Sequence, residues 1–395
     1  MALREQIASD DLRHITDIRH DLHAHPELGY EETRTSGVVQ RELSAAGVQF
    51  APGLAGGTGV LAYLPATSHP ETAPTVALRA DMDALPIEEN TGKLYASTVP
   101  GKMHACGHDG HTSILIGAAR QLARTAERPN NVLLVFQPAE EGGAGGKRMC
   151  EDGVLAGKVL GKPVDMIFGL HGFPHMKVGQ MGTKTGPLLA AADWFTIEVR
   201  GKGGHAAMPH MGIDPIVVAS HIVTALQTIA SRNVSPLESI VVTIGVVKAG
   251  TAHNVIPDTA TMIGTLRTLT PETRDLGERR IGEIVRGIAA SFGASAEIDF
   301  HRGYPVTHND PKATAHLRSV LGGMGLWEGE VPPVMGGEDF SFYGEHVPAC
   351  FYWLGLMNDD QETYPNLHAP EFDFNDRALP VGIEAMCALA LSPLG

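Results

Sequence analysis

Three short, continuous apolar runs constrain the fold of this chain more than any other feature. They cover residues 75–78, 131–136 and 165–170. Apolar runs without polar alternation are typical of strands that are buried on both faces of a parallel sheet. Helical spacing over 112–126 lies between the first two runs. The sequence therefore predicts an α/β domain built on a mixed, mainly parallel sheet.

Each of these runs leads into a cluster of acids or histidines. The first precedes Asp81 and Asp83, the second precedes Glu140 and Glu141, and the third precedes His171. In open α/β sheets, ligands bind at the carboxyl ends of the strands. We therefore expect these side chains to converge on one site.

A fourth cluster is the segment 104–111, which reads HACGHDGH and is expected as a loop just before the helix at 112. Cys106 and His108 are close enough in the chain to hold the same metal ion, and the glycines let the loop fold tightly. A surface loop that happens to contain histidines is the simpler interpretation. One cysteine and three histidines within eight residues favour the metal site. His368, which stands before a proline, is by itself more often structural.

The adjacent pair Glu140 and Glu141 has two interpretations. It is either a solvated charge pair at a strand end, or a pair in which one glutamate binds metal and the other transfers a proton. The glycine-rich stretch 142–146 that follows favours a loop beside a site.

The strand pattern changes near residue 187, after which apolar and polar residues alternate. Helices are expected to start after Asp214 and Thr270, each followed by a proline. Alternating strands are expected over 195–200, 240–247, 259–267 and 296–300. The order of strands and helices predicts a ferredoxin-like α+β domain. We expect it to span 188–301, inserted into a catalytic domain of 1–187 and 302–395.

Composition limits the possible partners. The net charge of −15 argues against nucleic acid, and no apolar run is long enough to span a bilayer. The N-terminal residues 1–6 are polar and lack a signal core, so a cytoplasmic location is expected. Four widely spaced cysteines do not suggest disulfides. Cys150, Cys350 and Cys387 are most simply small buried residues.

Six motifs along the chain, taken together, match one family. They lie at 23–27, 79–86, 103–111, 137–141, 203–210 and 336–340, in the family's order. The chain resembles the dinuclear metallopeptidase family of aminoacylases and glutamate carboxypeptidases. Within it, the chain looks like the amidohydrolase branch of hippurate hydrolases, N-acyl-amino-acid deacylases and auxin-conjugate hydrolases.

The resemblance implies a role for each matching residue. Glu140 would be the general base and then the acid, and Asp83 would orient a ligand. The metal ligands would be Cys106, His108, Glu141, His171 and His368. Asp81 stands where most members have a metal-binding histidine, and Cys106 replaces a bridging carboxylate. Both departures fit the amidohydrolase branch. The implied cofactor is a pair of divalent ions, either zinc, manganese, cobalt or nickel, since a thiolate favours softer ions over magnesium or calcium.

The inserted domain would bind the substrate and a second subunit. In the family, a histidine at the position of His205 reaches the neighbouring subunit's site and stabilises the oxyanion. Asn254 and Arg267 match a pair that binds the substrate carboxylate, and Gly336 and Gly337 would offer backbone contacts. The simpler interpretations are a loop histidine for His205 and a solvated strand residue for Arg267. A homodimer or homotetramer through this dimerisation or lid domain is implied.

The predicted function is metal-dependent hydrolysis of the amide bond of small-molecule N-acyl amino acids, such as hippurate-like, N-acetyl or aryl-acyl conjugates, by metal-activated water. One alternative is a dipeptidase or carboxypeptidase of the same family. Another is an amidase with Cys106 as nucleophile and His104 or His108 as base. A third is a non-catalytic binding protein that keeps the fold. The acyl group and the amino acid stay open at this point.

Overall fold

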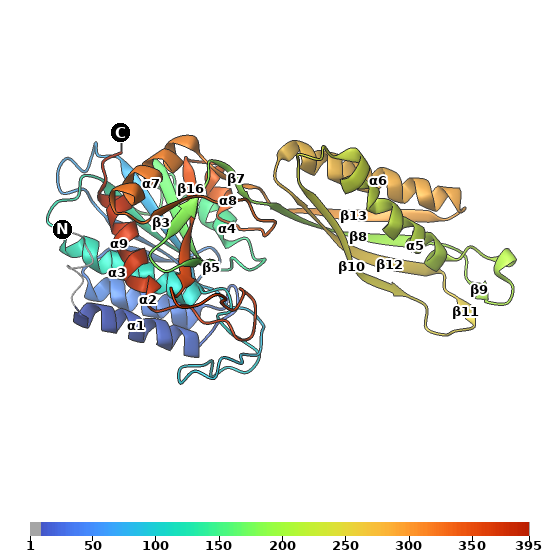
Figure 1. Cartoon of the computed structure of the whole chain (residues 1–395), viewed down its shortest axis with the longest axis horizontal. Coiled ribbons are helices and arrows are strands. Elements are labelled where there is room, and N and C mark those ends of the chain that lie inside the picture. The colour runs from blue at the N-terminus through green and yellow to red at the C-terminus, as the bar shows by residue number, and fades with distance from the viewer. Residues whose placement is uncertain (1–8, 395) are drawn as a thin grey trace. The chain divides into compact units, whose positions relative to one another are not determined.

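The computed structural model describes residues 9–394, which form two compact units (Figure 1). The first unit contains the chain up to Gly186, His308–Pro332 and the chain from Asp339 onward. The second contains Pro187–Thr307 and Pro333–Glu338. The expectation about the N-terminal residues 1–6 lies outside the described part of the chain.

The first unit is built on an eight-stranded sheet with the order β1-β2-β4-β3-β5-β16-β6-β15. Its central strands β4, β3, β5 and β16 run parallel. The strands of this sheet are β1 (Gln49–Leu54), β2 (Gly59–Leu64), β3 (Thr75–Asp81), β4 (Asn131–Gln137), β5 (Met166–Lys177), β6 (Met181–Thr183), β15 (Trp327–Glu330) and β16 (Ala349–Met357). Every residue of β3 and β4 is buried, as continuous apolar runs predict.

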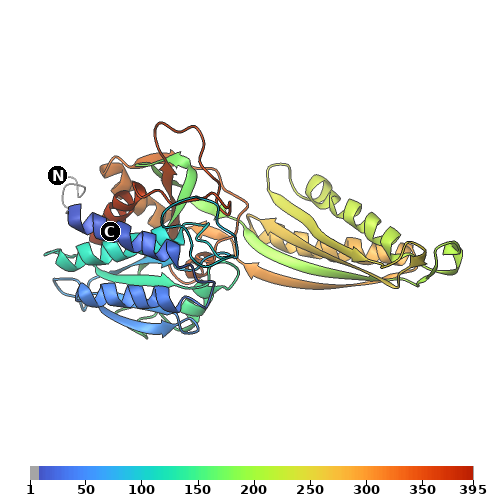
Figure 2. The same cartoon turned by 90° about the horizontal axis from the view of Figure 1, so that it is seen from below.

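Helices cover this sheet and close its core. They are α1 (Ser9–Ala24), α2 (Thr33–Ala45), α3 (His108–Arg124), α4 (Gly145–Glu151), α7 (Pro311–Gly323), α8 (Ser341–Gly344) and α9 (Ala378–Leu391). Figure 2 shows α1 beside α3, and α3 also packs on α9. Residues such as Leu22, Leu115 and Met386 have no exposed surface and join one apolar core with the strands. The predicted α/β fold with a mixed, mainly parallel sheet is confirmed.

The second unit contains a four-stranded antiparallel sheet with two helices. Its strands, in the order β10-β12-β8-β13, are β10 (Ile240–Ala249), β12 (Thr259–Thr268), β8 (Ala191–Arg200) and β13 (Ser295–Tyr304). Its helices are α5 (Pro215–Leu226) and α6 (Pro271–Ser291), with the short turns η2 (Pro209–Met211) and η3 (Ile229–Asn233). Asp214 and Thr270 cap the two helices through their side chains, as their sequences predict. The ferredoxin-like order of elements is confirmed.

Two small pairs of strands complete the structure. β9 (Gly204–His205) pairs with β11 (Val255–Ile256), and β7 (Gly186–Leu189) pairs with β14 (Thr307–Asn309). The second crossing between the units lies after Thr307, not at the expected 301, because β13 continues to Tyr304, which pairs with Ala192. Among residues 9–394, no helix is both long and apolar enough to cross a membrane.

Two local expectations were wrong. The segment 104–111 is not entirely a loop, because α3 begins at His108, directly after Gly107. Gly107 has a left-handed φ of 83°, which a side chain would disfavour. His171 does not follow the end of its strand, because β5 continues to Lys177 and pairs with β16 along that length. The pairing of β5 with β3 ends at Gly169, and β5 continues beyond that residue.

Candidate metal centre

Five side chains with metal-binding atoms lie together in the first unit and form two overlapping groups. One group is Cys106, His108 and His171, whose ligand atoms all lie within 4.8 Å of one another. All three residues are buried, and Cys106 Sγ is 3.3 Å from His171 Nε2. The second group is Cys106, Glu141 and His368. Because Cys106 belongs to both groups, its sulfur stands at the centre of the cluster.

Backbone contacts fix where His368 lies. Its N–H donates to the carbonyl oxygen of Ala105 at 2.8 Å, which ties its loop to the segment that carries Cys106. Its φ of 64° is left-handed, a conformation that needs support from its surroundings in a residue other than glycine. His368 Nε2 lies 3.2 Å from Glu141 Oε1. The sequence alone favoured a structural histidine here, whereas the fold brings it to Cys106 and Glu141.

The buried histidines are held in the tautomer that a metal ligand needs. A carbonyl oxygen can only accept, so His108 Nδ1 donates to the backbone oxygen of Asp83 at 2.8 Å. In the same way, His171 Nδ1 donates to the backbone oxygen of Gly172 at 2.8 Å. In the neutral rings, Nε2 is then unprotonated and carries the lone pair.

The donor set fits a divalent metal centre. Within the described part of the chain, the buried His108 Nε2 has no hydrogen-bond partner. A buried polar atom without a partner is costly, and an ion would satisfy it. Thiolate, imidazole and carboxylate together suit zinc and other transition ions.

Charges in the cluster shift the pKa values of its members. Burial disfavours the charged form of His108, but the nearby carboxylates Asp81 and Asp83 outweigh it and raise its pKa to about 10. Burial also opposes ionisation of Glu141, yet His368 and His108 hold its pKa below the usual value. Burial, helped by His111, keeps the pKa of His171 well below its usual value. A cation that binds here must displace the proton of His108.

Glu140 lies beside the cluster and is 6% exposed. A carboxylate oxygen of Glu140 lies within 4.8 Å of the ligand atoms of both His108 and Glu141. Glu140 Oε1 accepts the N–H of Asp339 at 3.3 Å. Asp83 accepts the backbone N–H groups of Glu140 and Glu141, one on each carboxylate oxygen, at 3.0 and 2.9 Å. The carboxylate of Asp83 therefore fixes the backbone that carries both glutamates. The same carboxylate lies 3.3 Å from His108 Nδ1.

Asp81 and His111 lie next to the cluster, and their ligand atoms form a further group with His108. Asp81 accepts from Arg79 Nη1 at 2.6 Å and from His111 Nδ1 at 2.7 Å. His111 Nε2 then accepts the N–H of Gly172 at 2.8 Å, directly after His171. One ring nitrogen of His111 therefore binds the end of β3, and the other binds β5. The spacing of the HACGHDGH motif does not distinguish this histidine from His108.

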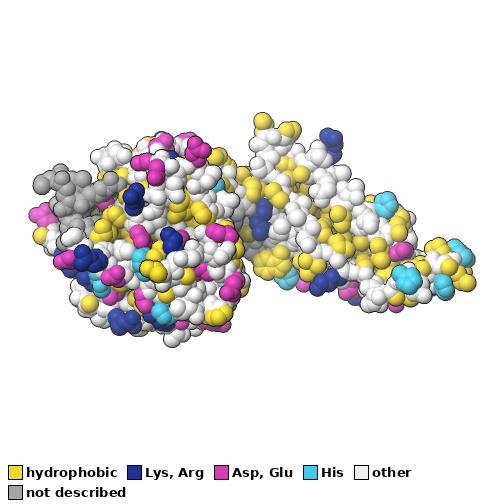
Figure 3. Space-filling view, turned by 60° about the horizontal axis from the view of Figure 1, so that its bottom comes forward, with side chains coloured by type: hydrophobic (Ala, Val, Ile, Leu, Met, Phe, Trp, Pro, Cys, Tyr) yellow, Lys and Arg dark blue, Asp and Glu magenta, His cyan; other side chains and the backbone are white. Residues whose placement is uncertain are grey.

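The expected substrate residues all lie in the second unit, at its two ends. His205 and Asn254 are exposed on the ribbon of β9 and β11, where Ala206 N–H donates to Asn254 O at 3.1 Å. Figure 3 shows histidine side chains gathered over this end of the second unit. The N–H of Ala207 donates to His205 Nδ1 at 3.0 Å. A neutral His205 must then carry its proton on Nε2, which makes Nε2 a donor.

Arg267, Gly336 and Gly337 lie at the other end of the second unit's sheet. Arg267 is near the end of β12, half-buried, and donates to the backbone oxygen of Asp193 at 3.1 Å. Gly336 accepts the N–H of Ala190 at 2.9 Å. The ribbon with Asn254 adjoins the start of β12 at Thr259. Eight residues separate Thr259 from Arg267, roughly 26 Å at about 3.3 Å per residue. One chain therefore does not bring Asn254 to Arg267.

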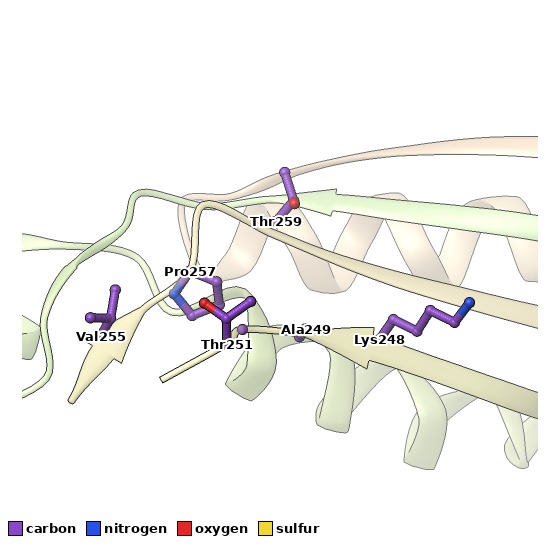
Figure 4. A pocket seen from close by; sticks show the side chains of 7 residues that line it. Lys248, Ala249, Thr251, Val255, Pro257 and Thr259 are labelled. Carbon is purple, nitrogen blue, oxygen red and sulfur yellow. The ribbon is translucent and has the colours of Figure 1, made fainter. Parts of the chain in front are cut away.

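The second unit also has an open hollow of about 340 Å³ beside β11 (Figure 4). It is lined by Lys248, Thr251, Val255, Pro257 and their neighbours. None of these lining residues is acidic or a histidine, in contrast to the residues of the metal cluster.

Residues 77–392 match the model of peptidase family M20/M25/M40. The chain belongs to this family. The match confirms the resemblance that the motifs indicate and covers every residue of the metal cluster.

Two relatives are similar along nearly the whole chain. The N-acetyl-L-cysteine deacetylase of Bacillus subtilis is 42% identical over 93% of this chain and 85% of its own length. The IAA-amino acid hydrolase ILR1-like 4 of Arabidopsis thaliana is 42% identical over 94% of this chain and 84% of its own. A solved Bacillus subtilis structure, a dinuclear metal-binding peptidase of the M20 family, is 36% identical. It matches with a TM-score of 0.84 over 97% of this chain and 98% of that one. The protein is thus a metal-dependent hydrolase that acts on amides.

Proposed function

We propose that this family member hydrolyses the amide bond of N-acyl amino acids and releases a carboxylic acid and a free amino acid. The observation that carries the proposal is the pair of ligand groups sharing Cys106, with Glu140 buried beside them. The names of the two 42% identical relatives, a deacetylase of an N-acetyl amino acid and a hydrolase of IAA-amino acids, support this substrate class.

Two divalent ions are the cofactor in this proposal. Cys106, His108 and His171 would hold one of them, and Cys106, Glu141 and His368 the other. Bound there, divalent ions lower the pKa of a water molecule and polarise the amide carbonyl.

Glu140 moves the proton. It takes a proton from the attacking water and returns it to the nitrogen of the leaving amine as the carbon–nitrogen bond breaks. Asp83 keeps Glu140 in place through the backbone N–H at 3.0 Å. The side chain of His368 is 51% exposed, whereas the other four residues of the cluster are largely buried. The substrate would therefore reach the cluster from the side of His368.

His205 and Asn254 would serve the site of a second subunit in a homodimer formed through the inserted unit. The Nε2–H of His205 would then donate to the oxygen of the attacked carbonyl. Arg267, whose guanidinium matches a carboxylate with two parallel hydrogen bonds, would bind the free carboxylate of the substrate, next to backbone contacts from Gly336 and Gly337. The separation of Asn254 from Arg267 along β12 supports a partner's contribution.

The test of the general base is Glu140→Gln in the metal-loaded enzyme, assayed on N-acetyl, N-benzoyl, long-chain acyl and indole-acetyl amino acids. Turnover should fall at least about 100-fold, because the amide cannot accept the proton. Metal content, measured by plasma mass spectrometry, should stay at the wild-type value. Glu151→Gln, on the exposed face of α4, is the control. Activity near the wild-type level in Glu140→Gln would contradict the assignment.

Chelation separates the proposal from the cysteine-nucleophile alternative. That alternative expects His104 or His108 as the base, whereas the histidine nitrogen that lies 3.3 Å from Cys106 Sγ belongs to His171. A nucleophilic cysteine would work after dialysis against chelator, whereas a metal hydrolase should lose activity and recover it with added zinc or manganese. Dipeptides in the same panel test the dipeptidase alternative. Preference for dipeptides over every acyl amino acid would favour it.

A further inference from the structure

The turn that carries the two glutamates has an unfavourable backbone conformation. It follows β4, and its residue Ala139 has a φ of 53°. In this left-handed region the β-carbon crowds the backbone, so residues other than glycine need support from their surroundings. Glu140 and Glu141 come directly after Ala139, so their direction depends on this residue.

Two carboxylates hold three consecutive backbone N–H groups of the turn. Asp83 accepts those of Glu140 and Glu141. Glu32 accepts the N–H of Ala139 on its Oε1 at 2.8 Å. Thr58 Oγ1 donates to Glu32 Oε2 at 2.8 Å, so both carboxylate oxygens of Glu32 are bound and the residue has no exposed surface.

Glu32 stands just before α2, where an acidic residue is ordinarily a helix cap. Its side chain makes no capping hydrogen bond. Glu27 instead accepts the first free N–H groups of that helix, from Arg34 at 2.9 Å and Thr35 at 2.8 Å. Because Glu27 serves the helix, the ordinary capping role does not explain why a carboxylate is buried at position 32.

The segment around Glu32 also packs on the turn. A β-carbon at Gly29 would lie 3.1 Å from both Cα and Cβ of Ala139, which shows how closely the two segments approach. Tyr30 donates its hydroxyl hydrogen to the carbonyl oxygen of Gly143. The contact between Glu32 and Ala139 is therefore one part of a continuous interface between residues 29–32 and the turn.

We propose that Glu32 is a positioning residue that holds Ala139 in its left-handed conformation and so directs Glu140 and Glu141 toward the metal cluster. This inference rests on the proposed function for the roles of the two glutamates. Glu32 contributes an acceptor, not a reacting group. Burial, together with the negative charge of Asp83, raises the pKa of Glu32 to about 7. Burying a carboxyl group costs free energy unless the group is hydrogen-bonded. The hydrogen bond from Ala139 offsets part of that cost and gives a reason for an acid at position 32.

The test compares three variants of the metal-loaded full-length protein. Glu32→Met keeps the length of the side chain and removes both acceptors. Glu32→Gln keeps one oxygen for Ala139, and its NH₂ group can donate to Thr58 Oγ1. The control is Glu31→Met, on the neighbouring residue, whose side chain is 62% exposed and forms an ion pair with Lys102. Two quantities are measured, hydrogen–deuterium exchange of the peptide that contains residues 139–141 and steady-state kinetics.

Glu32→Met should exchange at least about tenfold faster in that peptide, since the acceptor of the Ala139 N–H is lost. Its kcat should fall about 10- to 100-fold, because a shift near 1 Å at a catalytic group has that effect. KM and metal content should stay within about twofold of the wild type. Glu32→Gln should restore both exchange and kcat, and Glu31→Met should match the wild type.

The proposal is overturned if exchange in Glu32→Met matches the wild type, or if exchange accelerates while kcat is unchanged. If Glu32→Met does not fold, Glu32→Asp takes its place, since it withdraws the carboxylate by one methylene. Wild-type exchange and kcat in Glu32→Asp would then overturn the proposal. A wild-type enzyme that hydrolyses no N-acyl amino acid would contradict the proposed function alone, because the exchange measurement still tests the hold of Glu32 on Ala139.

Discussion

His23 is a buried histidine that lies between two carboxylates. Its Nδ1 is 2.8 Å from Asp109 and its Nε2 is 3.2 Å from Glu89. Burial disfavours the charged ring, but these carboxylates outweigh burial and raise the pKa of His23 to about 9. Both ring nitrogens are therefore donors over most of the physiological pH range, and the charged ring helps to hold Asp109 on the first turn of α3.

This pKa predicts how stability depends on pH. The folded pKa lies above the unfolded value of 6.5, so the contribution of His23 is complete below about pH 6.5 and is lost as the pH rises through about 9. Urea unfolding at pH 6 and pH 9.5 measures it. In the wild type, the free energy of unfolding should fall from pH 6 to pH 9.5. In His23→Gln this decrease should be smaller, by up to about 3 kcal/mol.

The control for His23 is His25→Gln, two residues along. His25 is 41% exposed, and exposed ion pairs add little to stability. An equal fall in wild type and His23→Gln would show that the ring is not charged in the folded protein.

At the scale of the element, helix α3 presents the candidate metal ligand His108 and its neighbour His111 on its first turn. Gly110 lies between them, and a β-carbon there would overlap the ring of Phe374. Phe374 also packs edge-on against His111, with ring centroids 5.9 Å apart. The absence of a side chain at Gly110 thus lets the C-terminal segment with His368 lie against the helix.

Gly110→Ala should therefore destabilise the protein by about 1–3 kcal/mol through overpacking, although alanine is the better helix former. Gly37→Ala, inside α2, is the matched control. A β-carbon there meets nothing closer than Arg41 Nη1 at 3.6 Å, so this change should stabilise by roughly 0.5–1 kcal/mol. Free energies of unfolding from urea titrations distinguish the two. Opposite signs are expected, and two stabilising substitutions would contradict the close contact with Phe374.

At the scale of the whole molecule, the proposed function requires residues from two chains. Glu140 and the metal cluster belong to the first unit, whereas His205 and Asn254 lie on the ribbon of the second. If His205 acts on the partner's site, two inactive variants can complement each other. In a heterodimer of Glu140→Gln with His205→Ala, one of the two sites then has both residues intact.

Mixing the unfolded variants in equal amounts and refolding them should restore roughly a quarter of wild-type activity, because half of the dimers are mixed and each has one intact site. Each variant refolded alone should stay inactive. If His205 acted within its own chain, both sites of the heterodimer would lack a residue and no activity would return. Size-exclusion chromatography of the refolded mixture confirms that dimers form.

Much of the fold could be predicted from local pattern. β3 and β4 are buried on both faces, so their apolar runs are continuous, and the proline-marked caps of α5 and α6 are encoded within a few residues. Helix α9 was not predicted. Nearly all of its residues are buried, so it has no polar face and no helical periodicity of apolar residues.

The sequence by itself determined which residue types meet at the candidate site. Cys106, His108 and Glu141 lie in recognisable motifs and His171 follows an apolar run, because metal chemistry demands particular side chains. Only the tertiary structure decided how they are held. It brought His368 to Cys106, separated Asn254 from Arg267 along β12, and joined Glu32 to Ala139 across 107 residues of chain. Apolar periodicity is a local property of the chain, whereas a buried hydrogen bond depends on which distant segments pack together.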